Sequence, residues 1–453
     1  MRSFDLIVIG AGSGLNISSA ASGLGMKVAV VEKGPMGGTC LNRGCIPSKI
    51  IIHSADVAET IKNSKKFGIN SKILTIDFAK ITERASRIVD KDAREIEDGI
   101  IEDKNTTLFK KEAKFVSDRT LIVGKEVIQG DKIVIAAGTR PLIPDIEGLS
   151  EVDYIISDEA LRLKNQPKIM TILGGGYIAA ELAHFFGSLG TKINIIQRND
   201  FLVPNEDTEI AEKFTDAFKE KYNVLTGFNA TKVAKKGKKF IVKAEGERSS
   251  ATLVSDQILV AVGRISNSDL LDLKKTNVYT NEKGYIKTND YMETTAKNIW
   301  ALGDIAGKYL FKHSANLEAQ IVYNNAVLKQ KIKVNYDAMP HAIFSSPQIA
   351  GVGATEQNLI DKKIDFVKGT YDYINSGMGT ALQDNIGFVK ILADRKSRKI
   401  LGCHIIGTDA SILIHEVIVA MKACLAVDSI RDAVHIHPSL SEVIQRAVNS
   451  IEF

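Results

Sequence analysis

The chain has 453 residues, of which 44% are hydrophobic and 25% charged, with a formal net charge of +5 at pH 7. This length exceeds a single core and predicts about three or four domains, while the lack of a long apolar run argues against a membrane span. The mild positive charge is spread along the chain and does not indicate a nucleic-acid partner.

The start of the chain indicates a cytoplasmic protein. Met1-Arg2-Ser3 leads directly into a strand-like run at residues 4–9, without the apolar segment and cleavage site of a secretory signal. In a reducing compartment the four cysteines do not form a structural framework, so a close pair among them is better explained by catalysis. We expect no membrane partner.

A βαβ dinucleotide-binding unit is predicted over residues 4–32. A buried strand is followed by Gly10-Ala11-Gly12-Ser13-Gly14, a helix of small residues and a second strand that ends at Glu32. Gly10 permits a tight turn, Gly12 lets a pyrophosphate approach the helix N-terminus, and Glu32 is placed to bind ribose hydroxyls. The sixth position of the glycine pattern is Leu15, so the interpretation depends on the strand context and on Glu32.

Two cysteines, Cys40 and Cys45, follow this unit in the segment GGTCLNRGCIPSK at residues 37–49. Their spacing alone is equally compatible with a redox-active disulfide and with a chance pair or half of a zinc site. No second cysteine pair or histidine cluster lies nearby to complete a metal site, so we predict a redox pair and no bound metal. Small residues before Cys40 suggest a helix N-terminus, where we expect a lowered thiol pKa. Lys49 adds positive charge one turn beyond Cys45.

This segment resembles the active-site segment of the FAD-dependent pyridine nucleotide-disulfide oxidoreductases, in a form closest to the dihydrolipoamide dehydrogenases. The resemblance implies that the N-terminal unit binds FAD, that Cys45 is the flavin-proximal sulfur and that Cys40 exchanges with the substrate. The residues expected to bind FAD in this part of the chain are Gly10, Gly12, Ser13, Gly14, Glu32, Lys33, Gly38, Thr39 and Lys49.

Residues 50–101 carry apolar side chains at helical spacing and predict core helices. Residues 132–141 resemble the strand and turn that close the FAD domain in this family, which adds Ala137 and Gly138 to the expected FAD contacts. Prolines and a glycine between residues 141 and 148 indicate a linker.

A second nucleotide unit is predicted over residues 168–198. Two such units and a dithiol in one chain imply electron transfer between a nicotinamide, a flavin and sulfur. The second strand ends in Gln197-Arg198, where an NAD-specific unit carries a carboxylate. Gln197 cannot repel a 2′-phosphate and Arg198 can pair with it, which favours NADPH over NADH. The alternative is that Arg198 is only an exposed cation at a strand end.

The crossover helix of this unit carries Tyr177 and Glu181. The resemblance implies that Tyr177 covers the flavin until the nicotinamide enters, and that Glu181 pairs with Lys49 beside the flavin. A buried glutamate is costly unless it is paired, which agrees with that role. The residues expected to bind NAD(P) are Gly174, Gly176, Tyr177, Ile178, Glu181, Gln197, Arg198, Gly263 and Arg264, and a second FAD segment contributes Gly303 and Asp304.

The C-terminal part, from about residue 336, alternates strands with amphipathic helices, and the resemblance makes it a dimer interface domain. His437 is followed by Pro438 and, five residues on, by Glu442, which matches the family's His-Pro-x-x-x-Glu. The resemblance implies that Glu442 orients His437, which acts as acid and base for the substrate thiols. It also implies a homodimer in which this histidine reaches the disulfide of the other subunit, while His435 is a spectator.

The predicted fold is therefore α/β, with two Rossmann-like dinucleotide-binding domains and a C-terminal α+β dimerisation domain. The expected domains are residues 1–148 (FAD binding, first part), 149–267 (NAD(P) binding), 268–335 (FAD binding, second part) and 336–453 (dimerisation).

The predicted activity is that of a dihydrolipoamide dehydrogenase, which moves electrons from a dihydrolipoyl dithiol, small or on a lipoyl domain, to NAD(P)+ through FAD and Cys40–Cys45. The alternative is an NADPH-dependent reductase of mycothione, glutathione disulfide or a similar small disulfide, which Gln197-Arg198 and Ala179 favour. A mercuric reductase is disfavoured because the C-terminal tail lacks vicinal cysteines. A structural subunit without turnover is disfavoured by the intact Cys40, Cys45 and His437.

Overall fold

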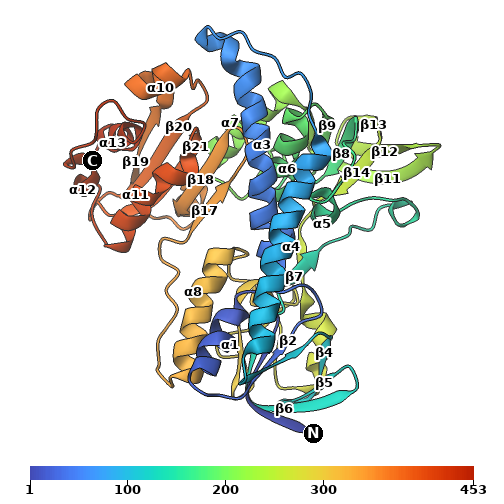
Figure 1. The fold of residues 1–453 in the computed structure, drawn as a ribbon. Coiled ribbons are helices and arrows are strands. Elements are labelled where there is room, and N and C mark those ends of the chain that lie inside the picture. Colours follow the sequence, from blue (N-terminus) through green and yellow to red (C-terminus); the bar gives the residue numbers. More distant parts are fainter. The chain divides into compact units, whose positions relative to one another are not determined.

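The structure, a computed structural model, describes residues 1–453 and divides into two compact units (Figure 1). The first comprises Met1–Ser48, Lys80–Leu142 and Gly263–Tyr336. The second comprises Lys49–Ala79, Ile143–Val262 and Asp337–Phe453. None of the helices combines the length and apolarity that a membrane crossing requires.

The first unit is built on a seven-stranded sheet in the order β3-β2-β1-β6-β5-β4, with β16 also paired to β6. The strands around β1 are parallel, and β4, β5 and β6 form an antiparallel meander. The strands are β1 (Arg2–Ile9), β2 (Val28–Val31), β3 (Thr106–Phe109), β4 (Ala113–Ser117), β5 (Thr120–Val123), β6 (Glu126–Ile135) and β16 (Ile299–Ala301).

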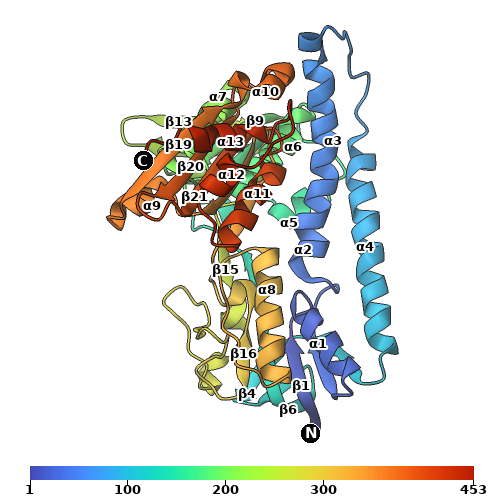
Figure 2. The same cartoon turned by 90° about the vertical axis from the view of Figure 1, so that its left-hand side faces the viewer.

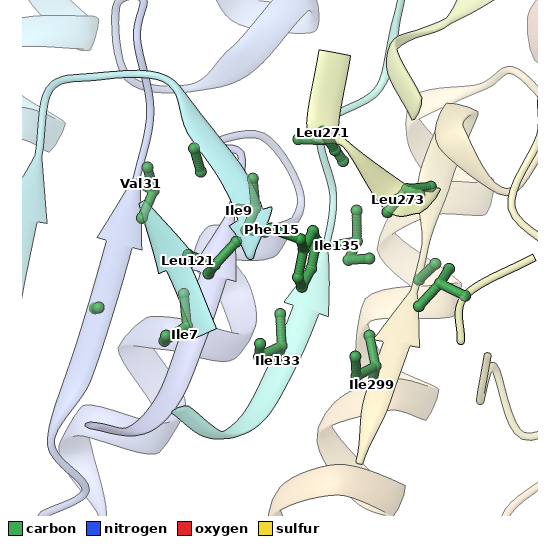
Figure 3. Close-up of a cluster of buried hydrophobic side chains, with 14 of the residues drawn as sticks. Ile7, Ile9, Val31, Phe115, Leu121, Ile133, Ile135, Leu271, Leu273 and Ile299 are labelled. Carbon is green, nitrogen blue, oxygen red and sulfur yellow. The ribbon is translucent and has the colours of Figure 1, made fainter. Parts of the chain in front are cut away.

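Both faces of this sheet are buried, which explains why its central strands read as continuous apolar runs. On one face, Ile7 pairs in register with Ile133 and Ile9 with Ile135, and Phe115 packs against them (Figure 3). The other face is covered by α1 (Gly14–Gly23) and α8 (Lys312–Val322), which lie side by side (Figure 1). The N-terminus of α1 is thereby held at the carboxyl end of β1.

The helical stretch predicted over residues 50–101 forms two helices, α3 (Cys45–Asn63) and α4 (Phe78–Glu102). A 3-10 turn at Ser64–Phe67 and a segment without regular structure separate them (Figure 2). The short helix α2 (Gly38–Arg43) directly precedes α3.

The second unit contains a four-stranded parallel sheet in the order β10-β9-β8-β14, the same arrangement as β3-β2-β1-β6. Its strands and helices are β8 (Ile169–Leu173), α6 (Tyr177–Ser188), β9 (Lys192–Gln197), α7 (Thr208–Lys221), β10 (Asn223–Thr226) and β14 (Gln257–Val260). An antiparallel sheet of β11 (Phe228–Lys236), β12 (Lys239–Gly246) and β13 (Ser250–Ser255) is inserted before β14.

The C-terminal part of the second unit is a five-stranded antiparallel sheet in the order β17-β18-β21-β20-β19. Its elements are β17 (Pro340–Ile343), β18 (Gln348–Gly353), α9 (Glu356–Asp361), β19 (Phe366–Asp372), α10 (Gly377–Leu382), β20 (Phe388–Asp394), β21 (Ile400–Gly407), α11 (Ala410–Lys422), α12 (Asp428–Arg431) and α13 (Glu442–Asn449). Helix α11 packs on β18 and β21, and α13 on β19 and β20 (Figure 2). The predicted fold class, two Rossmann-like units and a C-terminal α+β part, is confirmed.

Candidate active site

The first nucleotide turn requires glycine at residue 10. Gly10 has φ +104°, and a Cβ there would lie 2.3 Å from the carbonyl oxygen of Ala136. The Gly10 N–H donates to Val31 O at 2.8 Å, and the Ala136 N–H donates to Ile9 O at 2.8 Å. The turn is thus wedged between the ends of β2 and β6, where a side chain has no room.

Two more glycines bring backbone into close contact around this turn. A Cβ on Gly14 would lie 2.7 Å from Val8 Cγ1, so Gly14 supplies the close packing of helix on strand that Leu15 cannot. A Cβ on Gly38 would lie 2.7 Å from Gly12 Cα. The start of the dithiol segment therefore rests against the nucleotide turn.

Glu32 lies at the end of β2 and is anchored through both carboxylate oxygens. Its Oε2 accepts from the Ala11 N–H at 2.9 Å and its Oε1 from the Gly34 N–H at 2.7 Å. Each carboxylate oxygen has a second lone pair that can accept from a ribose hydroxyl. Lys33, by contrast, forms an exposed ion pair with Glu112 at 2.9 Å.

Ser13 and Thr39 also belong to the expected FAD contacts. The Ser13 hydroxyl donates to Asn316 Oδ1 and accepts from Lys312 Nζ, each at 2.9 Å, which ties the start of α1 to α8. Thr39 lies exposed in the first turn of α2.

The second FAD segment places Asp304 beside Thr139 and Arg264. The Thr139 hydroxyl donates to Asp304 Oδ2 at 2.9 Å and accepts from Arg264 Nε at 2.8 Å. Burial raises the pKa of Asp304 above its ordinary value. Arg264 and Gly263, which the sequence assigns to NAD(P) binding, belong to the first unit, where Arg264 also donates to Thr139 O at 2.8 Å.

Two residues near this segment, Glu318 and Tyr336, were not indicated by the sequence. Glu318 on α8 is buried, and its Oε2 accepts from the Gly303 N–H at 2.5 Å while its Oε1 accepts from the Tyr336 hydroxyl at 2.7 Å. Burial raises the pKa of Glu318 to about 7. Gly303 has φ +74°, a conformation that glycine adopts readily, and Glu318 holds this turn, which carries Asp304.

These features fit FAD. The glycine turn leaves backbone open to a pyrophosphate at the start of α1. Glu32 is fixed where the ribose of the dinucleotide lies in such folds, and Gly138, with φ +65°, has open space where a Cβ would stand. Asp304 adds a partly buried carboxylate, a group that requires hydrogen-bond partners.

The two cysteines occupy different helices. Cys40 is the third residue of α2 and partly buried, while Cys45 is exposed and is the first residue of α3; both are free thiols. The hydrogen bond with Cys45 and burial together raise the pKa of Cys40. The predicted lowering of the Cys40 pKa is therefore wrong: Cys40 lies in the first turn of α2, as expected, but the hydrogen bond with Cys45 and burial outweigh the helix dipole. The dipole of α3 favours negative charge on Cys45.

The pairing predicted between Lys49 and Glu181 is present. Lys49 Nζ lies 2.6 Å from Glu181 Oε2 and 2.7 Å from Oε1, and the Phe344 N–H donates to Oε1 at 3.1 Å. The Glu181 side chain is 13% exposed. A carboxylate this buried requires such partners.

Two further contacts, which the sequence did not indicate, fasten α6 to α3. His184 on α6 is fully buried, with Nε2 2.8 Å from Asp56 Oδ1 and Nδ1 3.1 Å from Ser188 Oγ. Lys62 Nζ donates to Ser188 O at 2.6 Å. The helix that begins at Cys45 is thus fixed to the helix that carries Glu181.

The second nucleotide turn repeats the first. Gly174 has φ +105°, and a Cβ there would lie 2.4 Å from Ala261 O. A Cβ on Gly175 would meet the Gln197 side chain at 3.0 Å, whereas Gly176 faces open space. Gln197 is buried at the end of β9, and the Arg198 side chain is exposed. The turn fits a dinucleotide, with an amide and a cation at the strand end. Tyr177 and Ile178 begin α6 directly after it, and Tyr177 donates to Glu206.

His437 lies in a segment without regular structure before α13. Its Nδ1 is 3.1 Å from Glu442 Oε1, and the Ser439 N–H donates to Glu442 Oε2 at 3.1 Å. These contacts hold the pKa of Glu442 below its ordinary value. The His437 side chain is 75% exposed and the Glu442 side chain only 9%. The buried Glu442 carboxylate therefore orients an imidazole that is open to solvent. His435 instead lies 2.8 Å from Glu416.

Exposed apolar side chains flank His437 in the sequence and also occur on α11. Val434 is 99% and Ile436 78% exposed, and Ile412 and Val419 on α11 are each 68% exposed. Apolar exposure of this extent is typical of a surface that another chain covers. The structure contains no group of three or more His, Cys, Asp or Glu side chains that could hold a metal ion.

Comparison with known proteins agrees with this geometry. Residues 4–342 match the family described as pyridine nucleotide-disulphide oxidoreductase, and residues 339–448 match its dimerisation domain. The mycothione reductase of Mycobacterium tuberculosis is 35% identical over 99% of both chains. The mercuric reductase of Staphylococcus aureus is 33% identical over 98% of this chain and 82% of its own.

A third relative is the dihydrolipoyl dehydrogenase of Geobacillus stearothermophilus, which is 32% identical over 98% of this chain and 95% of its own. Among solved structures, the HOCl-induced flavoprotein disulfide reductase RclA from Escherichia coli superimposes with a TM-score of 0.87 at 26% identity, over 98% of this chain and 99% of that chain.

Proposed function

Because this chain belongs to the pyridine nucleotide-disulphide oxidoreductase family, we propose that it is an NADPH-dependent reductase of a low-molecular-weight disulfide. Family members use FAD and NAD(P)H, and the chain is an enzyme of that class. The finer assignment depends on one observation, the Gln197-Arg198 pair at the end of β9.

The preference for NADPH follows from the chemistry of that strand end. A carboxylate there binds the ribose diol and repels a 2′-phosphate, as Glu32 would in the first unit. Gln197 carries no charge, and the exposed guanidinium of Arg198 can form a charge-assisted hydrogen bond with a phosphate. With NADPH as the electron donor, the dithiol site would reduce a disulfide rather than oxidise a dithiol.

FAD, when bound, supplies the redox chemistry that connects the nicotinamide with the Cys40–Cys45 pair. The proposed reaction of the chain's own residues begins with the reduced pair. The Cys40 thiolate attacks a sulfur of the substrate disulfide and releases one thiol. The Cys45 thiolate then attacks Cys40, releasing the second thiol and leaving the Cys40–Cys45 disulfide. One substrate disulfide thus becomes two thiols as two cysteines become one disulfide.

Cys40 needs a base for this reaction, because its hydrogen bond with Cys45 and its burial keep its proton on sulfur. His437 is the candidate base, since Glu442 orients it from Nδ1 and leaves Nε2 to face outward. It would take the Cys40 proton and return it to the leaving thiol. We assign this role to His437 of the second subunit in a homodimer, which these exposed apolar side chains and the family's dimerisation domain support.

The remaining site residues receive roles consistent with this scheme. Lys49 and Glu181 act as a charge pair beside the flavin, and Tyr177 covers the flavin, at the nicotinamide site, until the nicotinamide enters. The first unit is assigned to FAD. In the second unit, Ile143–Val262 is assigned to NAD(P) and Asp337–Phe453 to dimerisation.

Dihydrolipoamide oxidation with NAD(P)+ is the second candidate. The segment LNRGCIPSK favours it, and the dihydrolipoyl dehydrogenase relative is nearly as similar as the mycothione reductase. The same thiols and histidine serve that reaction in the opposite direction.

A substrate panel distinguishes the two. The purified flavoprotein would be assayed with mycothione, glutathione disulfide and lipoamide, each with NADPH and with NADH. We expect the highest kcat/KM with NADPH and a disulfide other than lipoamide. Turnover restricted to lipoamide and NADH would assign the protein to the second candidate.

A further inference from the structure

Tyr177, the first residue of α6, is held by a carboxylate that the proposed reaction does not use. Its hydroxyl donates to Glu206 in the loop between β9 and α7. Burial, with the Glu206 carboxylate next in effect, raises the pKa of Tyr177, so the phenol keeps its proton and is the donor. The Glu206 side chain has no exposed surface. A buried carboxylate is costly unless both oxygens have partners.

The second oxygen of Glu206 has its partner on another element. His341 on β17 lies with Nε2 2.8 Å from Glu206 Oε2. The same imidazole stacks on the Tyr177 ring, with centroids 6.0 Å apart and planes at 24°. Tyr177 is therefore restrained twice, at its hydroxyl by Glu206 and on its face by His341.

The space for His341 is created by a glycine on the neighbouring strand. Gly351 on β18 pairs in register with His341, and a Cβ on Gly351 would lie 2.7 Å from His341 Nε2. The ordinary backbone angle of Gly351 shows that the missing side chain, not the conformation, is what this position requires. His404 on β21 borders the same space, and its Nε2 donates to Ala354 O at 2.9 Å, since a carbonyl oxygen can only accept. Burial lowers the pKa of His404.

The loop that carries Glu206 is itself fixed. Gln357 Nε2 donates to Glu206 O at 2.8 Å. The next residue, Asp207, is fully buried, accepts from the Glu209 N–H at the start of α7 and lies 2.8 Å from Lys390 Nζ. Glu206 is thus a rigid anchor, and Tyr177 is the part of the contact that can move.

We propose that Glu206 and His341 are positioning residues that hold Tyr177 over the nicotinamide site, so that nucleotide entry requires the Tyr177–Glu206 hydrogen bond to break. This inference rests on the covering role given to Tyr177 in the proposed function. When only a fraction of the protein is open to ligand, the apparent Kd equals the intrinsic Kd divided by that fraction. We call the Tyr177–Glu206 hydrogen bond and the stacked His341 the tether. Weakening this tether raises the open fraction and therefore lowers the apparent Kd for the nucleotide.

The test is a double-mutant cycle on NADP+ and NADPH binding by calorimetry, with kcat and KM measured in parallel. Tyr177→Phe removes the hydroxyl but keeps the ring, and Glu206→Gln keeps the shape but removes the charge. A hydrogen bond to a charged group is worth enough for each variant to lower Kd and KM for NADPH about 5- to 10-fold, with kcat within about twofold. The double variant should match Tyr177→Phe, because Glu206→Gln only weakens the acceptor of a bond that Tyr177→Phe removes.

Two further variants refine the test. Gly351→Ala displaces His341 without touching Tyr177 or Glu206, and we expect it to lower the NADPH Kd in the same direction by a smaller factor. Tyr371→Phe removes a phenol hydroxyl that donates to Asn375 O at 2.7 Å, far along the chain from this cluster, and should leave Kd and KM unchanged.

Higher Kd values in Tyr177→Phe and Glu206→Gln, or effects that add in the double variant, would overturn the tether. Binding is read independently of turnover, so a protein that binds NADP(H) but reduces no disulfide would refute the proposed function while leaving the tether testable by its Kd values. A protein that binds no nicotinamide nucleotide would refute both.

Discussion

The two Rossmann units of this chain have the same strand order and the same glycine turn. They differ in the residues at the end of the second strand. The strand orders β3-β2-β1-β6 and β10-β9-β8-β14 correspond. Gly10 and Gly174 have φ +104° and +105°, and a Cβ on either would strike a carbonyl oxygen at 2.3 or 2.4 Å. Both turns thus need glycine for the same steric reason. The glycines therefore do not indicate which nucleotide each unit binds.

The difference lies in what surrounds each turn. The first unit ends its second strand in Glu32, held by two backbone N–H groups, and carries the dithiol on the segment that packs on Gly12. The second unit ends in Gln197 and Arg198 and carries Tyr177. In the proposed function, side chains beside each turn, rather than the shared turn itself, therefore distinguish a unit for FAD and sulfur chemistry from a unit for NADPH.

The largest expected effect comes from a substitution that abolishes disulfide exchange in the first unit and leaves the second unit unchanged. Cys40→Ser should lower disulfide reduction by about 1,000-fold or more, because the nucleophile of exchange is lost. NADPH oxidation with an artificial quinone acceptor should persist within about threefold, since it does not need the dithiol. Steady-state assays with both acceptors check this, with Cys424→Ser, an exposed cysteine outside the site, as control. Equal loss in both assays would contradict the division of roles.

A second prediction compares the buried carboxylates of the two units, each of which accepts from a tyrosine. Glu206 has His341 as a partner, whereas Glu318 has only Gly303 N–H and Tyr336, and its pKa is raised to about 7. Since this folded-state pKa exceeds the unfolded one, the stability that the proton contributes is complete below about pH 4.5 and is lost as pH rises through 7. Glu318→Gln should therefore stabilise the protein more at pH 8 than at pH 5, by up to about 3 kcal/mol.

Urea unfolding of the flavoprotein at these two pH values measures the difference. Glu112→Gln is the matched control, because Glu112 is exposed and paired with Lys33. An equal change in the free energy of unfolding at both pH values would show that Glu318 does not titrate between them.

A third prediction, with a smaller expected effect, concerns substitutions at the end of β9 that make it resemble the end of β2. Gln197→Glu should lower the preference for NADPH over NADH about 10-fold or more, because a carboxylate repels the 2′-phosphate and binds the ribose diol. Arg198→Ala should weaken NADPH and spare NADH. The measurement is the ratio of kcat/KM for the two nucleotides. If Arg198→Ala weakened both equally, Arg198 would be only an exposed cation.

Much of the fold and part of the site could be predicted from the sequence. The central strands are buried on both faces, so their continuous apolar runs and following glycines indicate parallel Rossmann strands. The Lys49–Glu181 and His437–Glu442 pairs also follow from sequence, through resemblance to a family. Lys49 and Glu181 are 132 positions apart and His437 and Glu442 are five apart. Hydrophobic periodicity indicates neither pair.

The residues that sequence reasoning missed act through tertiary contacts. Glu318, Glu206 and His184 each lie on a helix or in a loop whose local pattern gives no sign of a buried polar role. The Cys40 pKa was mispredicted for the same reason, because a hydrogen bond with Cys45 and burial raise it although Cys40 lies in the first turn of α2. Local sequence indicated the helix N-terminus at Cys40 but not the contacts of its thiol.

The central claim is that the second unit is built for NADPH although its turn is the same as that of the first. The most direct measurement is the ratio of kcat/KM for NADPH to that for NADH in the unmodified flavoprotein, with a disulfide substrate at saturation. The pairing of Arg198 with a 2′-phosphate predicts a ratio above about 10. A ratio below 1 would contradict the claim and favour the NAD-linked oxidation of dihydrolipoamide.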